Sequence, residues 1–163
     1  MVKTAVALVL TAALGGCAAH SGAARPGRVG GPVPKWSLQS TTGAHLTDAS
    51  FAGKPVYMNF FATWCPPCNE EAPDVNAMQK KYAAQGLQVV GVDEAESMEK
   101  ARSFMKAHRL DFPAVADDGT LEDAFLVNGL PVHVFIARNG TIQMIHAGEM
   151  SREQIEAAVR SVL

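Results

Sequence analysis

Two cysteines separated by two prolines are the residues of this sequence best suited to chemistry. Cys65 and Cys68 follow directly after the apolar run 56–61 (VYMNFF). A strand that passes into a helix places the first thiol at the helix N-terminus, where unpaired backbone N–H groups favour a thiolate. The second thiol lies one helical turn further on, close enough to form a disulfide. The spacing therefore predicts electron exchange with other disulfides, with Cys65 as the nucleophile and Cys68 as the resolving thiol.

A passive cross-link or half of a zinc site would use the same pair of cysteines. The loop between them is so short that a disulfide would constrain the unfolded chain little. Zinc needs two more ligands, and His133 and His146 fall on predicted strands rather than in a second tight cluster. We therefore follow the redox interpretation, and we expect neither a metal nor another cofactor.

The start of the chain has the pattern of an export signal. Lys3 precedes the apolar stretch 5–14, which is too short to span a bilayer comfortably, so residues 1–16 are predicted to be a signal peptide. The end of this stretch, Leu-Gly-Gly-Cys, resembles a bacterial lipoprotein cleavage box, which implies acylation of Cys17 and a membrane anchor. The alternative is an ordinary secretory signal with an incidental cysteine. Both interpretations predict a periplasmic or otherwise extracytoplasmic protein.

Composition suggests a short tether and one domain. Residues 17–34 are rich in Gly, Ala and Pro and are predicted to form a lipid-anchored flexible tether, followed by a single domain over 35–163. The chain has 14 basic and 16 acidic side chains and no cluster of Lys or Arg with aromatic residues. Nucleic-acid binding is therefore not expected, and we expect a monomer.

Strand and helix patterns alternate along the domain. A small hairpin is predicted over 36–46, followed by buried strands at 56–61 and 87–92 and by helices at 66–84 and 98–108. A second hairpin with an Asn-Gly turn covers 132–147. A closing helix begins at Ser151, which stands in capping-box spacing with Gln154. This order predicts an α/β protein with a mixed sheet covered on both faces.

These elements and the cysteine motif together resemble the thioredoxin fold. The segment Trp64-Cys65-Pro66-Pro67-Cys68 is similar to the Trp-Cys-x-x-Cys site of that superfamily, Pro73 matches its helix-kinking proline, and Gly129-Leu130-Pro131 matches its cis-proline segment. The resemblance implies a central mixed sheet flanked by helices, with an added N-terminal hairpin. Within the superfamily, residues 34–163 resemble the TlpA-like extracytoplasmic thiol–disulfide oxidoreductases, which include the reductases of cytochrome c maturation.

The resemblance also implies roles for residues around the cysteines. Pro131 is expected to be cis, so that the backbone of Leu130 faces an extended substrate; a trans proline that starts an edge strand is the alternative. Trp64 is expected to shield the disulfide and contact substrate, or else simply to pack.

Three polar residues need a separate interpretation. Glu96 matches a glutamate near the active site of the cytochrome c maturation reductases and is our candidate acid/base, although with its acidic neighbours at 93, 94 and 99 it could be part of a solvated loop. Asn59 stands where ordinary thioredoxins have a buried aspartate, and it cannot accept a proton from Cys68. His133, in an apolar strand, is interpreted as a core histidine rather than a ligand or proton relay.

The resulting hypothesis is a membrane-anchored thiol–disulfide oxidoreductase that acts more as a reductase than as an oxidase. Its partners would be protein disulfides, including cytochrome c apoproteins, and a membrane or periplasmic thiol electron donor. One alternative is a thiol peroxidase, but such enzymes have a threonine three residues before the cysteine, and Thr63 is two before Cys65. The other is a copper- or zinc-binding chaperone, but the copper-delivering relatives of this fold usually have three residues between the two cysteines, and here there are two.

Overall fold

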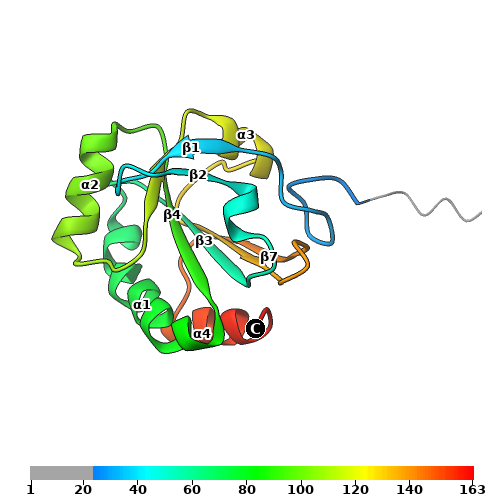
Figure 1. The fold of residues 1–163 in the computed structure, drawn as a ribbon. Coiled ribbons are helices and arrows are strands. Elements are labelled where there is room, and N and C mark those ends of the chain that lie inside the picture. Colours follow the sequence, from blue (N-terminus) through cyan, green and yellow to red (C-terminus); the bar gives the residue numbers. More distant parts are fainter. Residues whose placement is uncertain (1–23) are drawn as a thin grey trace, which may run out of the picture.

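The computed structural model describes residues 24–163, which form a five-stranded mixed sheet with helices on both faces (Figure 1). The predicted signal peptide and Cys17 lie outside the described residues. The strand order is β5-β4-β3-β6-β7. The strands are β3 (Val56–Phe61), β4 (Gln88–Asp93), β5 (Ala114–Ala116), β6 (Val132–Ile136) and β7 (Ile142–Ala147). The predicted α/β thioredoxin-like architecture is therefore confirmed.

Strand β3 lies at the centre of the sheet, parallel to β4 and antiparallel to β6. All six of its residues are buried, because helices cover both faces; this explains why the sequence is apolar without alternation. Side chains alternate between two cores, with Tyr57 and Phe61 on one face and Met58 and Phe60 on the other. The carboxyl end of β3 leads directly into the cysteine motif.

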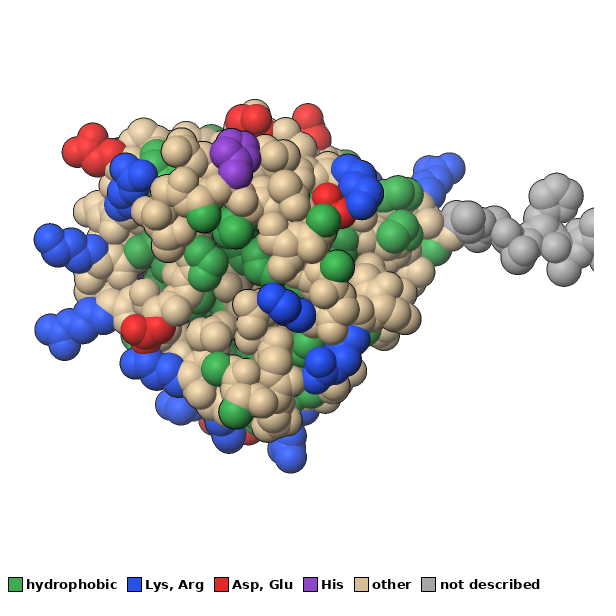
Figure 2. Space-filling model, viewed as in Figure 1, with side chains coloured by type: hydrophobic (Ala, Val, Ile, Leu, Met, Phe, Trp, Pro, Cys, Tyr) green, Lys and Arg blue, Asp and Glu red, His purple; other side chains and the backbone are tan. Residues whose placement is uncertain are grey.

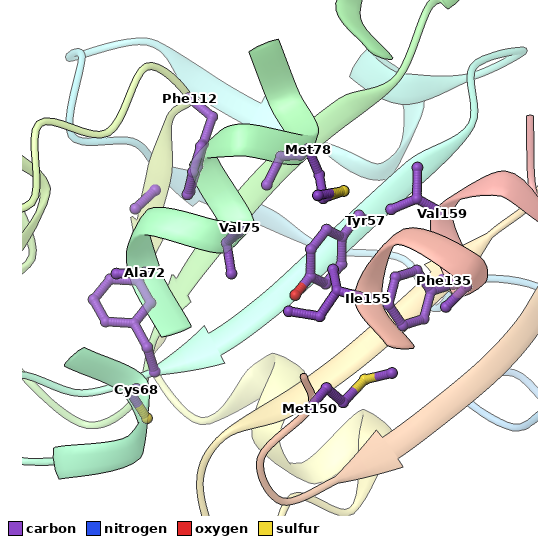
Figure 3. Packing of buried hydrophobic residues seen from close by; sticks show 14 of the residues in the cluster. Tyr57, Cys68, Ala72, Val75, Met78, Phe112, Phe135, Met150, Ile155 and Val159 are labelled. Atoms are coloured by element: carbon purple, nitrogen blue, oxygen red, sulfur yellow. The ribbon is translucent and has the colours of Figure 1, made fainter. Parts of the chain in front are cut away.

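Three helices cover one face of the sheet. These are α1 (Pro66–Tyr82), α2 (Met98–Ala107) and α4 (Arg152–Arg160). Their buried side chains form one cluster with Tyr57 and Phe135 of the sheet (Figure 3). Within it, Tyr57 and Phe135 stack with ring centroids 4.6 Å apart. Helix α4 has the predicted cap, since Ser151 and Gln154 form a reciprocal capping box.

The opposite face carries the N-terminal hairpin and a short helix. Strands β1 (Ser37–Gln39) and β2 (His45–Thr47) form the predicted hairpin, and a single 3₁₀ turn η1 (Asp48–Phe51) leads to β3. Helix α3 (Thr120–Phe125) packs Leu121 and Phe125 into the second cluster, beside Trp36. The sequence patterns predicted neither α3 nor β5, which have six and three residues respectively. Helix α1 also ends earlier than predicted, before the 3₁₀ turn η2 (Ala83–Gln85).

The folded part begins earlier than the predicted domain boundary at residue 35. Gly30 and Gly31 exchange backbone hydrogen bonds with Ile142, and Val33 donates to the carbonyl of Gly140. The guanidinium of Arg28 donates to the carbonyl of Ala124 at 2.8 Å. The segment from Gly27 to Val33, which we assigned to the flexible tether, is thus fixed along β7, because its backbone finds partners on an edge strand.

Charges of both signs are present on the surface. On the face in Figure 2, Lys and Arg side chains project mainly from the lower and left-hand margins, whereas acidic side chains lie mainly along the upper edge. Within residues 24–163, no helix is long and apolar enough to cross a bilayer.

Candidate active site

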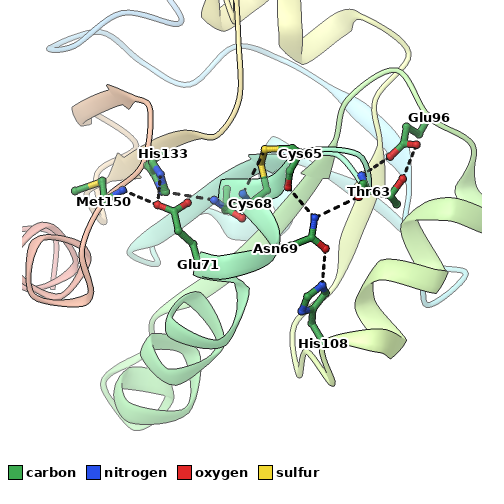
Figure 4. Close-up of a disulfide and its surroundings, with 10 residues drawn as sticks. Thr63, Cys65, Cys68, Asn69, Glu71, Glu96, His108, His133 and Met150 are labelled. Atoms are coloured by element: carbon green, nitrogen blue, oxygen red, sulfur yellow. Dashed lines mark hydrogen bonds and ion pairs between the residues drawn. A yellow bond between two sulfur atoms is a disulfide. The ribbon is translucent and has the colours of Figure 1, made fainter.

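Cys65 and Cys68 form a disulfide at the N-terminus of α1 (Figure 4). Cys65 is the N-cap residue, and its Sγ accepts the backbone N–H of Cys68 at 3.3 Å. The two prolines occupy the first two helical positions, where no N–H donor is needed. An anionic sulfur at position 65 would therefore face a backbone donor and the positive end of the helix dipole, which favours its ionisation.

Both cysteines are covered in this oxidised state. Cys65 is 2% exposed and Cys68 is 4% exposed, and both belong to the buried cluster that also contains Phe61 and Ala72. Our sequence interpretation made Cys65 the nucleophile, a role that needs an accessible sulfur, whereas this oxidised state covers it. In contrast, Trp64 is 67% exposed, so packing in the core is not its role. The large apolar surface next to the disulfide is consistent with contact to another protein.

The predicted cis peptide bond is confirmed at Leu130-Pro131. Leu130 is partly buried and packs against both hydrophobic clusters, one of which contains the two cysteines. The carbonyl of Pro131 accepts the N–H of Gly148 at 2.8 Å. Contact of Leu130, Pro131 and Trp64 with substrate stays a prediction.

Glu96 fixes the loop that precedes the nucleophile. Its carboxylate accepts both the backbone N–H and the hydroxyl of Thr63, and it pairs with Lys100 at 2.9 Å. Burial on its own would raise the pKa of Glu96, but the hydrogen bonds from Thr63 and Lys100 outweigh it, and the pKa lies below its usual value. Glu96 is thus ionised and fully engaged by donors. Its proposed acid/base role stays a prediction.

Asn69, which the sequence analysis did not single out, holds the same loop from the other side. Its Nδ2 donates to the carbonyls of Thr63 and Cys65, at 3.2 and 2.7 Å. Its Oδ1 lies 2.9 Å from Nε2 of His108, at the end of α2. The backbone around Cys65 is therefore tied to both α1 and α2.

A second residue that sequence reasoning missed is Glu71, a buried carboxylate one turn after Cys68. Residues three apart on a helix share a face, and both side chains are buried. Glu71 Oε1 accepts the backbone N–H of Met150, and it lies 3.4 Å from Nε2 of His133. Among the described residues, Oε2 has no hydrogen-bond partner. Within the described residues, only one of the two carboxylate oxygens of Glu71 is thus held by a hydrogen-bond donor.

His133 links Glu71 to the centre of the sheet. It is fully buried, its Nδ1 lies 2.8 Å from the hydroxyl of Tyr57, and Nδ2 of Asn59 lies 3.5 Å from the same nitrogen. Burial, reinforced by the negative charge of Glu71 and partly offset by a hydrogen bond with Asn59, raises the pKa of Tyr57 well above its usual value. Tyr57 is therefore a neutral phenol whose hydroxyl is within hydrogen-bond distance of Nδ1 of His133. His133 is thus the core histidine that we predicted, and its second ring nitrogen also faces Glu71.

Asp93, at the carboxyl end of β4, is a third buried acid near this loop. Neither of its oxygens has a hydrogen-bond donor within the described part of the chain. Burial, together with the charge of Glu96, raises the pKa of Asp93 from 3.8 to about 7, and Lys100 only partly opposes this. Of these two neighbouring acids, Asp93 therefore holds a proton at mildly acidic pH while Glu96 is ionised.

Asp93 should make the protein less stable as the pH rises. Its folded pKa of about 7 lies above the unfolded value of 3.8, so its contribution is complete below pH 3.8 and is lost as the pH passes 7. We expect Asp93→Asn to remove this loss and to raise the free energy of unfolding at pH 8 by about 2 kcal/mol. Urea unfolding of the wild type and of Asp93→Asn, repeated at several pH values from 4 to 8, measures this difference in the free energy of unfolding. Equal pH slopes in the two proteins would contradict the assignment.

No three His, Cys, Asp or Glu side chains of residues 24–163 lie together as a potential metal site. The cysteine pair thus has no further ligands close by in this part of the chain.

Comparisons with known proteins connect this geometry to an activity. Residues 29–145 match the model of the AhpC/TSA family. The chain is 32% identical over 157 residues to the thiol-disulfide oxidoreductase ResA of Bacillus subtilis, covering 94% of this chain and 88% of that protein. It is 31% identical to ResA of Geobacillus kaustophilus, covering 99% and 95%. A thiol:disulfide interchange protein of the thioredoxin family from Chlorobium tepidum superimposes with a TM-score of 0.75 at 30% identity, covering 85% and 97%.

Proposed function

Because this chain belongs to the AhpC/TSA family and is a thiol–disulfide oxidoreductase of the ResA type, we propose that it reduces disulfides of proteins outside the cytoplasm. The observation that carries the proposal is the disulfide at the start of α1, with the buried carboxylate of Glu71 one turn beyond it. A base one helical turn after the second cysteine would promote the step that releases a reduced client, which is the step that a reductase needs.

In the first step the reduced enzyme attacks its client. The thiolate of Cys65 forms a bond to one sulfur of the client disulfide, and the second client sulfur leaves as a thiolate that takes a proton from water. The N–H of Cys68 and the start of α1 stabilise the attacking thiolate before the step. Trp64 is exposed next to Cys65, and Leu130 packs against the cluster that contains both cysteines; together with Pro131 they provide the proposed docking surface for the client chain.

In the second step Cys68 resolves the mixed disulfide. Glu71 Oε2 accepts the thiol proton of Cys68, and the resulting thiolate attacks Sγ of Cys65. The bond between Cys65 and the client breaks, and the client leaves with two electrons and, after protonation, two thiols. A dithiol donor protein then reduces the Cys65–Cys68 disulfide again. We assign the proton transfer to Glu71, and to Glu96 the positioning of Thr63 and hence of the Cys65 loop.

Clients and electron flow can be tested together. We expect the Cys65–Cys68 couple to have a reduction potential below about −200 mV. Equilibration of the protein with glutathione buffers measures this potential. It should reduce an oxidised Cys-x-x-Cys-His peptide, the haem-attachment motif of cytochrome c, about tenfold faster than a disulfide peptide of unrelated sequence. Equal rates on both peptides would remove cytochrome c apoproteins as preferred clients. A reduction potential above about −150 mV, together with no reduction of either peptide, would contradict the reductase proposal and indicate an oxidase.

The membrane anchor is a separate part of the proposal. It is supported by the lipoprotein-like segment that ends in Cys17. We expect cells to incorporate labelled fatty acid into the wild-type chain but not into Cys17→Ser, and the variant to leave the membrane fraction. Equal labelling of both would contradict acylation at Cys17.

A further inference from the structure

The buried contacts of His133 determine which of its nitrogens carries a proton. Tyr57 is a neutral phenol, and its hydroxyl lies 2.8 Å from Nδ1. Asn59 Nδ2, at 3.5 Å, is a second donor toward the same nitrogen. With donors aimed at Nδ1, this nitrogen is the acceptor, and the proton of the neutral ring lies on Nε2.

The Nε2 atom faces Glu71. The distance from Nε2 to Glu71 Oε1 is 3.4 Å, which is too long for a good hydrogen bond but short enough that a small movement would form one. The two side chains are 0% and 4% exposed, so water screens their interaction little. A carboxylate at this depth needs donors to stay ionised, and Met150 N–H and His133 are the donors within reach among the described residues.

We propose that His133 is a positioning residue for the resolving step: with its tautomer set by Tyr57, it donates Nε2–H to Glu71 and holds that carboxylate in place as the acceptor for the thiol proton of Cys68. The inference rests on the proposed function of Glu71. The titratable groups that face His133 are Tyr57 from β3, Glu71 from α1 and His146 from β7, whose ring centroid lies 6.1 Å away. His146 has no contact with Glu71 among those described, and it therefore provides a matched control.

Stopped-flow mixing of the reduced protein with dithiobis-nitrobenzoate separates the two steps. Attack by Cys65 releases one coloured thiolate in a phase that depends on reagent concentration. Resolution by Cys68 releases the second in a phase that does not. Each variant is made in the full chain carrying Cys17→Ser, so that only the two active-site thiols react, and both phases are followed from pH 5 to 9.

We expect His133→Leu to move the midpoint of the resolving phase to higher pH, because Glu71 loses a hydrogen-bond donor to its carboxylate. The resolving phase at pH 7 then slows about tenfold, while the first phase changes less than about twofold. His133→Gln keeps an N–H donor and should restore most of the rate. Tyr57→Phe, which removes only a hydroxyl, should move the midpoint in the same direction by less. His146→Leu should change neither phase.

Several results would overturn the inference. One is an unchanged pH midpoint of the resolving phase in both His133→Leu and Tyr57→Phe. Another is an equal slowing of both phases in His133→Leu. A third is failure of His133→Gln to restore the rate of the resolving phase. If His133→Leu does not fold, Tyr57→Phe and His133→Gln still decide the question. Absence of a second phase in the Cys17→Ser protein itself would instead contradict the proposed function, so the two failures are distinguishable.

Discussion

Cys68→Ala should stop turnover and leave the client covalently attached to Cys65. The first step needs only the thiolate of Cys65 and its helix-terminal environment, which this substitution leaves in place. The second step has lost its nucleophile, so disulfide reduction falls by at least about 1,000-fold. In the Cys17→Ser chain, dithiobis-nitrobenzoate should release one thiolate per protein instead of two, and mass spectrometry should detect the retained aromatic thiol.

The reciprocal variant is the control for this trap. Cys65→Ala retains the Cys68 thiol, which lacks the N-cap position of Cys65 and the backbone N–H donor that faces the Cys65 sulfur. It should react with the reagent at least about 100-fold more slowly than Cys68→Ala. If the two single-cysteine proteins react at the same rate, the sulfurs are equivalent and the assignment of nucleophile and resolving thiol is wrong. When the Cys68→Ala protein is incubated with a periplasmic extract, the client retained on Cys65 can be identified.

The fold was predictable where apolar patterns are long. The run 56–61 could be assigned as β3 because six consecutive buried residues at the sheet centre need apolar side chains whichever face they occupy. Ser151 and Gln154 marked the start of α4 because a helix N-terminus needs acceptors for its free N–H groups. By contrast, β5 is three residues long and owes its structure to pairing with β4. Its sequence therefore contains no periodic signal of its own.

The site was predictable only in part. The cysteines and Pro131 are local motifs, so their neighbours in sequence identify them. Glu70 and Glu71 are indistinguishable in sequence, yet Glu70 is exposed and Glu71 is buried. What distinguishes them is that β6 and the segment before α4 bring His133 and Met150 to Glu71. Those partners are 62 and 79 positions away in the chain (133 − 71 and 150 − 71), and no local pattern encodes such a contact.

Glu71→Gln should separate chemistry from stability. The amide has nearly the same shape and still accepts the N–H of Met150 through its oxygen, but it cannot take a proton from Cys68. We expect the resolving phase to slow about 100-fold at pH 7, within the usual range for loss of a general base, and the phase that reports Cys65 to stay within about twofold. Replacing a buried charge with a neutral group often leaves stability equal or higher. In urea unfolding, the free energy of unfolding of Glu71→Gln should therefore be at most about 1 kcal/mol below that of the wild type.

Glu70→Gln is the matched control for this carboxylate. It makes the same chemical change one position earlier on α1, on a side chain that is exposed, and it should leave both phases unchanged. If Glu71→Gln and Glu70→Gln behave alike, the proton of Cys68 goes to water or to another group, and Glu96→Gln becomes the next variant to examine. Because Glu96 accepts hydrogen bonds from Thr63 beside the nucleophile, its loss should slow the Cys65 phase instead. The same two-phase measurement thus assigns each of the two glutamates to its own step.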